Sequence, residues 1–350
     1  MTIKINLEKA YDMLQWSFLK SVLEAAGFEE GFRNLIMTCV SSSSLNMLWN
    51  GEESEFFLPK RGLRQGDPIS PFLFILCMDR LSHIIDDAVR SKKWKPVMIT
   101  KEGPAVSHLM FADDLLLFGE ASEEQDRSMM EAINNFCDAS GEKVSIAKSS
   151  IFFSPKVPAD LKGRIKNITR MKIASEIGKY LGFPLTRKRS SRETFQYVID
   201  RVKSKLAAWK SNCLTMAGRI TLAKTVISSV PLYPMQVTQQ PATVCAEVER
   251  LQRRFIWGNN DNTRGYSPIS WERITLPKHY GGLGIKKLNS VNRAFNAKLA
   301  WSLVKGTEGL WAEVLKKKYM FRDEATLLNS KSTDSGLWKF ICKQEQVVEE

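Results

Sequence analysis

The sequence predicts an α+β fold in which helices pack on one face of an antiparallel sheet. Three observations lead to this fold class. Strand-like and helix-like segments alternate up to about residue 185, the helical segments carry recognisable ends, and the chain becomes mainly helical after about residue 186. Such an order is typical of a layered sheet-and-helix domain. With 350 residues, the chain has room for two or three domains or subdomains, and we place the main boundary near residue 186.

The first predicted element is a strand over residues 3–7. Apolar and polar side chains alternate there, which is the period of a strand with one buried face and one wet face. The buried face carries Ile3, Ile5 and Leu7, and the wet face carries Lys4, Asn6 and Glu8.

Three helices are predicted next. The first has apolar residues at helical spacing over residues 16–26 and stops at Gly27. The second runs over residues 70–89, with Ser70 as its N-cap and proline at its first helical position. The third starts after Ser122, with Glu123 and Glu124 in its positive first turn, and ends at Gly141. Short apolar segments at 107–118, 144–153 and 179–185 are predicted strands.

The second half is predicted to hold helices with basic faces. They span residues 192–209, 216–230, 241–257 and 289–304. Residues 258–286, which are rich in Gly and Asn, are predicted to form loops with short strands.

Charge is unevenly distributed along the chain. Of the 51 Lys and Arg and the 38 Asp and Glu, residues 1–150 hold 16 and 22, a net charge of −6, and residues 151–350 hold 35 and 16, a net charge of +19. A basic half of this size suits a nucleic-acid backbone, and the alternative is a solvated basic surface without a specific partner.

Other classes of protein find little support. No apolar run reaches the roughly 20 residues of a membrane helix, and the first residues hold no apolar signal segment. An intracellular protein, nuclear or cytoplasmic, is therefore expected. The cysteines are scattered singly, which disfavours a zinc site or a disulfide framework; they are Cys39, Cys77, Cys137, Cys213, Cys245 and Cys342.

The sharpest local signal is the pair Asp113-Asp114 after Phe111-Ala112, between two apolar segments. Adjacent carboxylates repel each other, and burial disfavours their charged forms, so a hairpin that presents both to divalent cations removes the cost. Mg²⁺ prefers carboxylate oxygens and substrate phosphates. The alternative is a plain Asp-Asp hairpin turn.

A second signal is the loop of residues 61–71, which feeds directly into the predicted helix at Ser70. Its two glycines allow a close backbone approach, and Arg61, Arg64 and Gln65 can reach phosphate, sugar or base edges. The alternative is an ordinary Gly/Pro loop with a helix cap.

Together with residues 4–12, these segments resemble the reverse transcriptases of non-LTR retrotransposons of the long-interspersed-element type, as found in plants. Residues 141–149 and 180–185 resemble two further segments of that family, with Ser145 in place of the usual Asn. Segments near 217–219, 231–235, 255–258 and 281–284, and Trp301, resemble the tail of plant members.

The resemblance implies an RNA-directed DNA polymerase. It implies a polymerase palm over residues 1–185, a helical thumb-like region over 186–258 and a basic helical tail over 259–350. Two Mg²⁺ or Mn²⁺ ions would serve as cofactors, and an RNA template, a DNA primer and deoxynucleoside triphosphates as partners.

The resemblance also implies site residues. Asp113 and Asp114 would be the metal ligands, and Lys148 would lie near the leaving pyrophosphate. Tyr11 would exclude the 2′-hydroxyl of an incoming ribonucleotide, unless its ring only covers the core. Template and nucleotide contacts would come from Tyr11, Arg64, Gln65, Gly66 and Phe111, and a primer grip from Tyr180, Leu181 and Gly182.

Two departures qualify this picture. The first catalytic aspartate of the family falls on Asn6, whose neutral amide offers one acceptor oxygen and cannot bridge two ions with a full negative charge. Glu8, roughly 6–7 Å along the strand, and Asp12, in a following helix, are not convincing replacements. The family's fingers and endonuclease segments lie upstream of this position, so the chain is expected to be a truncated, weak or inactive polymerase.

Two alternatives stay open. One is a non-catalytic nucleic-acid-binding remnant, in which tryptophans near basic residues stack on bases; the same tryptophans at helical spacing also fit a core. The other is a chain without a stable fold. The tryptophans concerned are Trp209, Trp257, Trp271, Trp301 and Trp311.

Overall fold

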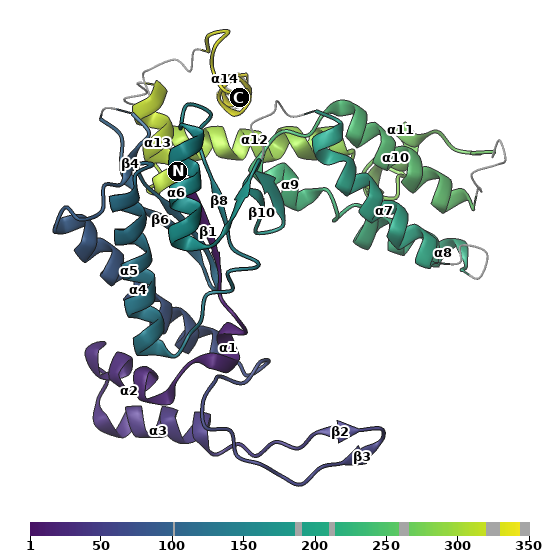
Figure 1. Cartoon of the computed structure of the whole chain (residues 1–350). Coiled ribbons are helices and arrows are strands. Elements are labelled where there is room, and N and C mark those ends of the chain that lie inside the picture. Colours follow the sequence, from purple (N-terminus) through teal and green to yellow (C-terminus); the bar gives the residue numbers. More distant parts are fainter. Residues whose placement is uncertain (101, 186–190, 210–213, 259–265, 320–329, 344–350) are drawn as a thin grey trace. The chain divides into compact units, whose positions relative to one another are not determined.

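A computed structural model describes residues 1–100, 102–185, 191–209, 214–258, 266–319 and 330–343. The chain divides into two compact units, Met1–Leu185 and Thr186–Glu350, which are described separately. Figure 1 shows the elements of both units along the sequence.

The first unit is built on a five-stranded sheet with the strand order β6-β7-β1-β8-β9. The neighbouring strands are antiparallel, as predicted, except β8 and β9, which are parallel. Helix α6 lies between β8 and β9 in the chain, and such a crossover makes two strands parallel. The strands are β1 (Thr2–Asn6), β6 (His108–Phe111), β7 (Asp114–Phe118), β8 (Ser150–Phe152) and β9 (Lys172–Ala174).

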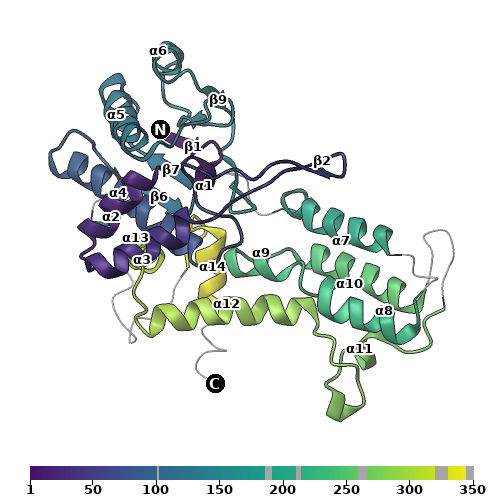
Figure 2. The same cartoon turned by 90° about the horizontal axis from the view of Figure 1, so that it is seen from below.

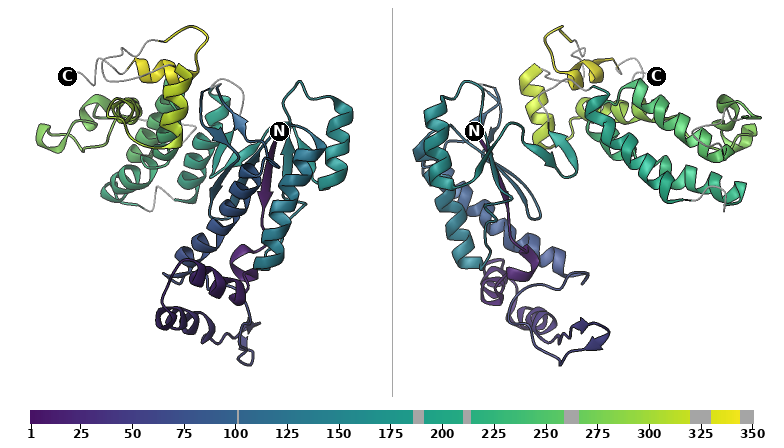
Figure 3. Two further views of the ribbon diagram at one scale, coloured as in Figure 1. Left: turned by 90° about the vertical axis from the view of Figure 1, so that its left-hand side faces the viewer. Right: turned by 45° about the vertical axis from the view of Figure 1, so that its right-hand side comes forward.

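Helices pack on the sheet through one continuous core, which confirms the predicted α+β class. Its centre includes Ile3 and Ile5 of β1, both 0% exposed, as the alternation in the sequence predicted. Figures 2 and 3 show α4 and α5 running beside the sheet. The helices of this unit are α1 (Ala10–Met13), α2 (Trp16–Ala25), α3 (Glu30–Ser41), α4 (Ser70–Arg90), α5 (Glu123–Ser140) and α6 (Ala159–Thr169).

The helix ends test the predicted caps. Ser122 caps α5 by accepting a hydrogen bond from the backbone N–H of Gln125, and Gly141 ends that helix with a φ of 80°. The predicted cap at Ser70 is wrong, because Ser70 is already inside α4 and Ile69 is the N-cap. Asp67 takes over the role in the loop, since its carboxylate accepts the N–H of Ile69 at 3.1 Å.

Three two-stranded hairpins complete the first unit. The sequence did not predict the arm formed by β2 and β3, which extends away from the sheet in Figure 1. The arm carries exposed apolar side chains, with Leu48 72% and Trp49 77% exposed. The hairpin strands are β2 (Leu48–Trp49), β3 (Glu52–Glu53), β4 (Val97–Met98), β5 (Ala105–Val106), β10 (Gly178–Tyr180) and β11 (Phe183–Leu185).

The second unit is helical in the residues that the structure describes. The four predicted helices are present, and α8 continues into a π-helical stretch, η3. The short strands predicted within 258–286 are wrong for residues 266–286, which form α11 and η4; residues 259–265 and Cys213 lie outside the described residues. The elements are η1 (Glu193–Phe195), α7 (Gln196–Ala208), α8 (Met216–Leu222), η3 (Ala223–Ile227), α9 (Leu232–Val237), α10 (Ala242–Trp257), α11 (Trp271–Ile274), η4 (Lys278–Tyr280), α12 (Leu288–Val304), α13 (Leu310–Tyr319) and α14 (Gly336–Cys342).

Hydrophobic clusters lie within the described residues of this unit. One includes Phe255, Ile256 and Trp271, and another includes Leu303 and Trp338. Trp209 and Trp257 pack against the first cluster, so three of the five tryptophans considered above belong to the core. Trp301 and Trp311 remain 47% and 39% exposed. Within the described residues, no helix combines the length and hydropathy needed to cross a bilayer.

Candidate active site

The register of three strands brings the predicted site together. The Cα atom of Asn6 in β1 is paired with that of Asp114 in β7, and Asp114 is paired with Phe111 in β6. Directly opposite residues of antiparallel strands lie on the same face, with Cα atoms about 4.5–5.5 Å apart. Asn6 and Asp113 are 107 residues apart along the chain. The strand register nevertheless brings position 6 and the paired acids together at one end of the sheet.

Ala112 and Asp113 form the two-residue turn between β6 and β7. Ala112 has a φ of 51°, in the left-handed region, which costs a non-glycine residue about 1–2 kcal/mol. The sheet on both sides holds this conformation. Asp113 is exposed and Asp114 is half-buried, so both carboxylates remain accessible, and Phe111 is 64% exposed beside them.

The backbone of Asn6 is held from the side opposite β7. Its N–H donates to the hydroxyl of Ser149 at 3.1 Å, and its carbonyl accepts the N–H of Ser145 at 2.8 Å. Ser145 replaces the Asn expected from the resemblance, and the bond that it makes here comes from its backbone. Lys148 is exposed on the turn between these two serines.

Tyr11 lies between the core and the acids. Its ring stacks on Phe74 with the centroids 4.6 Å apart, and burial, followed by the charge of Asp113, raises the pKa of its hydroxyl. The ring therefore covers part of the core, which was the alternative given for this residue. The exclusion of a 2′-hydroxyl by Tyr11 stays a prediction.

The loop predicted to bind nucleotide is pinned to Tyr11. The N–H of Leu63 donates to the carbonyl of Tyr11 at 2.6 Å, and Gly62 approaches the next residue so closely that an added Cβ would lie 2.8 Å from the carbonyl oxygen of Asp12. Gly62 also has a φ of 88°, in the left-handed region. Both the close approach and the backbone conformation therefore favour glycine at this position. The following residues, Arg64, Gln65 and Gly66, are exposed.

The predicted primer-grip segment is a tight hairpin. Leu181 and Gly182 both have positive φ, 49° and 77°, the requirement for a two-residue turn that matches the twist of its strands. Burial, followed by the charge of Asp114, raises the pKa of Tyr180. Lys4 of β1 donates a hydrogen bond to the carbonyl of Lys179. The hairpin thus lies against the face of β1 that carries Asn6.

Sequence reasoning missed one acid at this site. Glu142 is 2% exposed, and neither of its carboxylate oxygens has a hydrogen-bond partner among the described residues. Burial, followed by the charge of Asp113, raises its pKa to about 8, and Glu142 in turn helps burial to raise the thiol pKa of Cys77 and Cys137 to about 12. The only signal in the sequence was an acid directly after the glycine that ends α5.

The donor set for a metal contains two carboxylates and one amide. Glu8 and Asp12 are exposed and outside β1, and the described residues hold no cluster of three His, Cys, Asp or Glu side chains that could bind a metal ion. Asp113 and Asp114 suffice for a Mg²⁺ ion that also takes phosphate oxygens.

Comparisons with known proteins agree with this geometry. A family model described as reverse transcriptase (RNA-dependent DNA polymerase) matches residues 1–185. A putative ribonuclease H protein of Arabidopsis thaliana is 34% identical over 45% of this chain and 26% of its own length. A retrovirus-related Pol polyprotein from a type-2 retrotransposable element of Drosophila melanogaster is 34% identical over 33% of this chain and 10% of its own length.

Two matches cover more of the chain. An uncharacterized transposon protein of Xenopus laevis is 23% identical over 84% of this chain and 22% of its own length. A solved telomerase from Candida albicans is 11% identical, with a TM-score of 0.39, over 92% of this chain and 51% of the other. The chain spans about a quarter or less of the three sequence relatives. The family match, on top of the motifs and their meeting at one end of the sheet, shows that the chain belongs to the reverse transcriptase family, of the non-LTR retrotransposon type that its motifs indicated.

Proposed function

We propose that Met1–Leu185 is the palm of an RNA-directed DNA polymerase, which extends a DNA primer with deoxynucleoside triphosphates against an RNA template. The observation that carries the proposal is the strand register of Asn6 with Asp114 next to the Asp113 turn. This register brings position 6 next to the paired acids, which is where polymerase chemistry requires carboxylates to lie together.

Asp113 and Asp114 would hold Mg²⁺ or Mn²⁺. When bound, such ions stabilise the charge on the attacking and leaving oxygens of an in-line phosphoryl transfer. The chain's own residues orient the reactants: Tyr11, fixed by its stack on Phe74, limits the space beside the sugar. The exposed ammonium of Lys148 offsets charge on the leaving pyrophosphate.

Nucleic-acid contacts come from the surrounding loops. Arg64, Gln65 and Gly66 are exposed on the loop pinned to Tyr11, which suits contacts to template and nucleotide. The hairpin around Leu181, which lies against the Asn6 face of the sheet, suits the primer end.

Asn6 impairs this activity. An amide brings no negative charge and one acceptor oxygen, whereas metal-assisted phosphoryl transfer would call for a third carboxylate at this position. Losing such a ligand costs several kcal/mol of transition-state stabilisation, or roughly 10³-fold or more in rate. Glu142 is buried, and within the described part of the chain it does not join the two acids in a cluster of three that could hold a metal.

Primer extension on an RNA template tests the proposal. The unmodified chain should extend the primer weakly or not at all, and Asn6→Asp should raise the rate by roughly 10³-fold or more, because it restores the missing carboxylate. Asn6→Ala is the matched control and should not raise the rate. Robust synthesis by the unmodified chain would overturn the impairment, and no gain with Asn6→Asp would count against the polymerase site.

An exposed tryptophan in the second unit supports a second candidate function, non-catalytic binding of nucleic acid. Trp301 is 47% exposed with the ammonium of Lys305 4.9 Å from its ring centre, an arrangement suited to stacking and phosphate contacts in a non-catalytic nucleic-acid-binding protein. Binding of single-stranded RNA that falls steeply with salt, without any primer extension by Asn6→Asp, would favour this function.

A further inference from the structure

A pocket in the second unit has two lysines in its lining. It also has three hydroxyls, each of which donates to a backbone carbonyl, so the donors left for a ligand are those of the lysines. Its volume is about 230 Å³, below the range of about 300–1,000 Å³ that holds drug-sized ligands, and it suits a small group rather than a whole nucleotide. None of its lining residues is acidic. They are Lys224, Thr225, Ser228, Ser229, Leu232, Gly284, Lys286, Leu288 and Val291.

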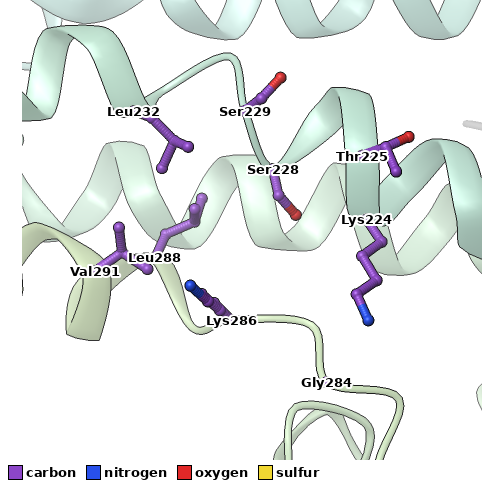
Figure 4. Close-up of a pocket in the computed structure, with 9 residues that line it drawn as sticks. All are labelled: Lys224, Thr225, Ser228, Ser229, Leu232, Gly284, Lys286, Leu288 and Val291. Carbon is purple, nitrogen blue, oxygen red and sulfur yellow. The ribbon is translucent and has the colours of Figure 1, made fainter.

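The two lysines come from different elements. Lys224 belongs to the π-helical stretch η3, and Lys286 to the loop that leads into α12. Figure 4 shows the side chain of Lys224 running from the helix toward Gly284, and Lys286 on the loop that crosses below the helix. Two cations in the lining of one pocket, with no acid among the lining residues, suit an anion.

The ammonium of Lys224 keeps donors for a ligand. It donates one hydrogen bond, to the carbonyl of Leu283 at 3.2 Å, and an ammonium has three. Within the described residues, neither Lys224 nor Lys286 forms an ion pair with a carboxylate. Glu249, which bonds the lining residue Leu288, accepts the N–H of Leu288 and the indole N–H of Trp271.

The helix is deformed at the pocket by a buried side chain. Gln252 of α10, 0% exposed, donates to the carbonyl of Ala223 and to the hydroxyl of Ser228, both at 2.8 Å. The same carbonyl accepts the N–H of Ser228, five residues on, which is the π-helical bond. Such π-helical turns occur frequently at functional sites. Here the widened turn sets Lys224 and Ser228 side by side on the pocket wall.

We infer that this pocket binds a single phosphate group of a nucleic-acid backbone between Lys224 and Lys286. The inference rests on the proposed function, which supplies nucleic acid as the partner. Residues 186–350 carry 28 Lys and Arg against 14 Asp and Glu, a net charge of +14, which attracts such a backbone in general. The pocket adds a fixed point of contact.

The test measures binding of a fluorescein-labelled 20-nucleotide single-stranded RNA to the full chain by anisotropy, over a series of salt concentrations. Lys224→Gln/Lys286→Gln should weaken binding about 10-fold or more and lower the salt slope by about 0.7, the value for one phosphate of a single strand. Lys287→Gln/Lys298→Gln removes the same charge from exposed lysines outside the pocket and should leave the slope unchanged.

Two variants guard against loss of fold. Lys286→Gln alone, on an exposed side chain, should still lower the slope, and Lys224→Arg should retain binding. Equal losses for the two double variants would overturn the pocket while leaving nucleic-acid binding intact. No RNA binding by the unmodified chain would overturn the proposed function itself, and the inference with it. If inorganic phosphate raises the melting temperature only when the pocket lysines are present, yet both pairs lose RNA binding equally, the pocket serves a free anion and the inference fails.

Discussion

The two units of the chain place their sites by different means. In the first unit, strand register joins segments that are far apart in the sequence, so that Asn6, Asp114 and Ser145 are neighbours through backbone pairing. In the second unit, the pocket depends on a side chain of α10, Gln252, that deforms a neighbouring helix. The pairing of strands can be predicted from the pattern of apolar and polar residues. A helix deformation that involves one side chain distant in the sequence cannot be predicted in this way.

The strongest way to break this comparison is to weaken each core separately. Phe74→Ala in the first unit and Phe255→Ala in the second each remove a buried ring that contacts another aromatic ring, Tyr11 and Trp209 respectively. Each should lower the free energy of unfolding by about 3–5 kcal/mol. Calorimetry should show two transitions, of which each variant lowers one. A single transition that both variants lower alike would mean that the units unfold together.

A pH series sharpens the comparison. Asp126 of α5 is 0% exposed, its carboxylate oxygens have no hydrogen-bond partner among the described residues, and burial raises its pKa to about 7. The unfolded chain loses this proton near its ordinary pKa of 3.8. Stability therefore falls as the pH rises between these two values, by up to about 1.4 kcal/mol per pH unit.

Replacing that carboxyl should remove its part of the pH slope. Urea unfolding of Asp126→Asn should give a free energy close to that of the parent at pH 4 and roughly 1–3 kcal/mol higher at pH 8. Asp138→Asn, on the exposed side of the same helix, is the control and should follow the parent. The change should appear in the unfolding transition of the first unit. If the free energy of unfolding falls equally in the parent and in Asp126→Asn between pH 4 and pH 8, this role for Asp126 is excluded.

The smallest expected effects come from matched helix caps. Ser122 caps α5 in the first unit and Thr215 caps α8 in the second, each through a side-chain oxygen that accepts a backbone N–H. Ser122→Ala and Thr215→Ala should each cost about 1 kcal/mol, and Ser122→Thr and Thr215→Ser should cost less. Chemical denaturation measures the free energy of unfolding of all four variants. A negligible cost in the second unit alone would show that tertiary contacts hold α8.

Much of the first unit was predictable, because its signals are local. The alternation over residues 3–7 predicted which face of β1 is buried, and Ser122 and Gly141 predicted both ends of α5. The hairpin at Ala112 followed from two apolar segments around paired acids. Each of these features is decided by neighbours in the sequence, as helix caps and strand faces are.

What escaped prediction depends on partners far away in the sequence. The proline after Ser70 predicts a cap at Ser70, but the carboxylate of Asp67 accepts the N–H of Ile69, and Ile69, one residue earlier, is the N-cap. Glu142 was passed over because an acid is expected at the surface, and its burial arises from packing around Cys77 and Cys137. The roles of Lys148, Gln65 and Tyr180 stay predictions.

The two backbone bonds of Asn6 have an evolutionary consequence. Because Ser149 and Ser145 bind its N–H and its carbonyl, they hold the strand whatever side chain stands at this position. An asparagine codon becomes an aspartate codon by one nucleotide change. The impairment proposed for Asn6 is therefore one that a lineage could reverse in a single mutational step, without first rebuilding the scaffold around it.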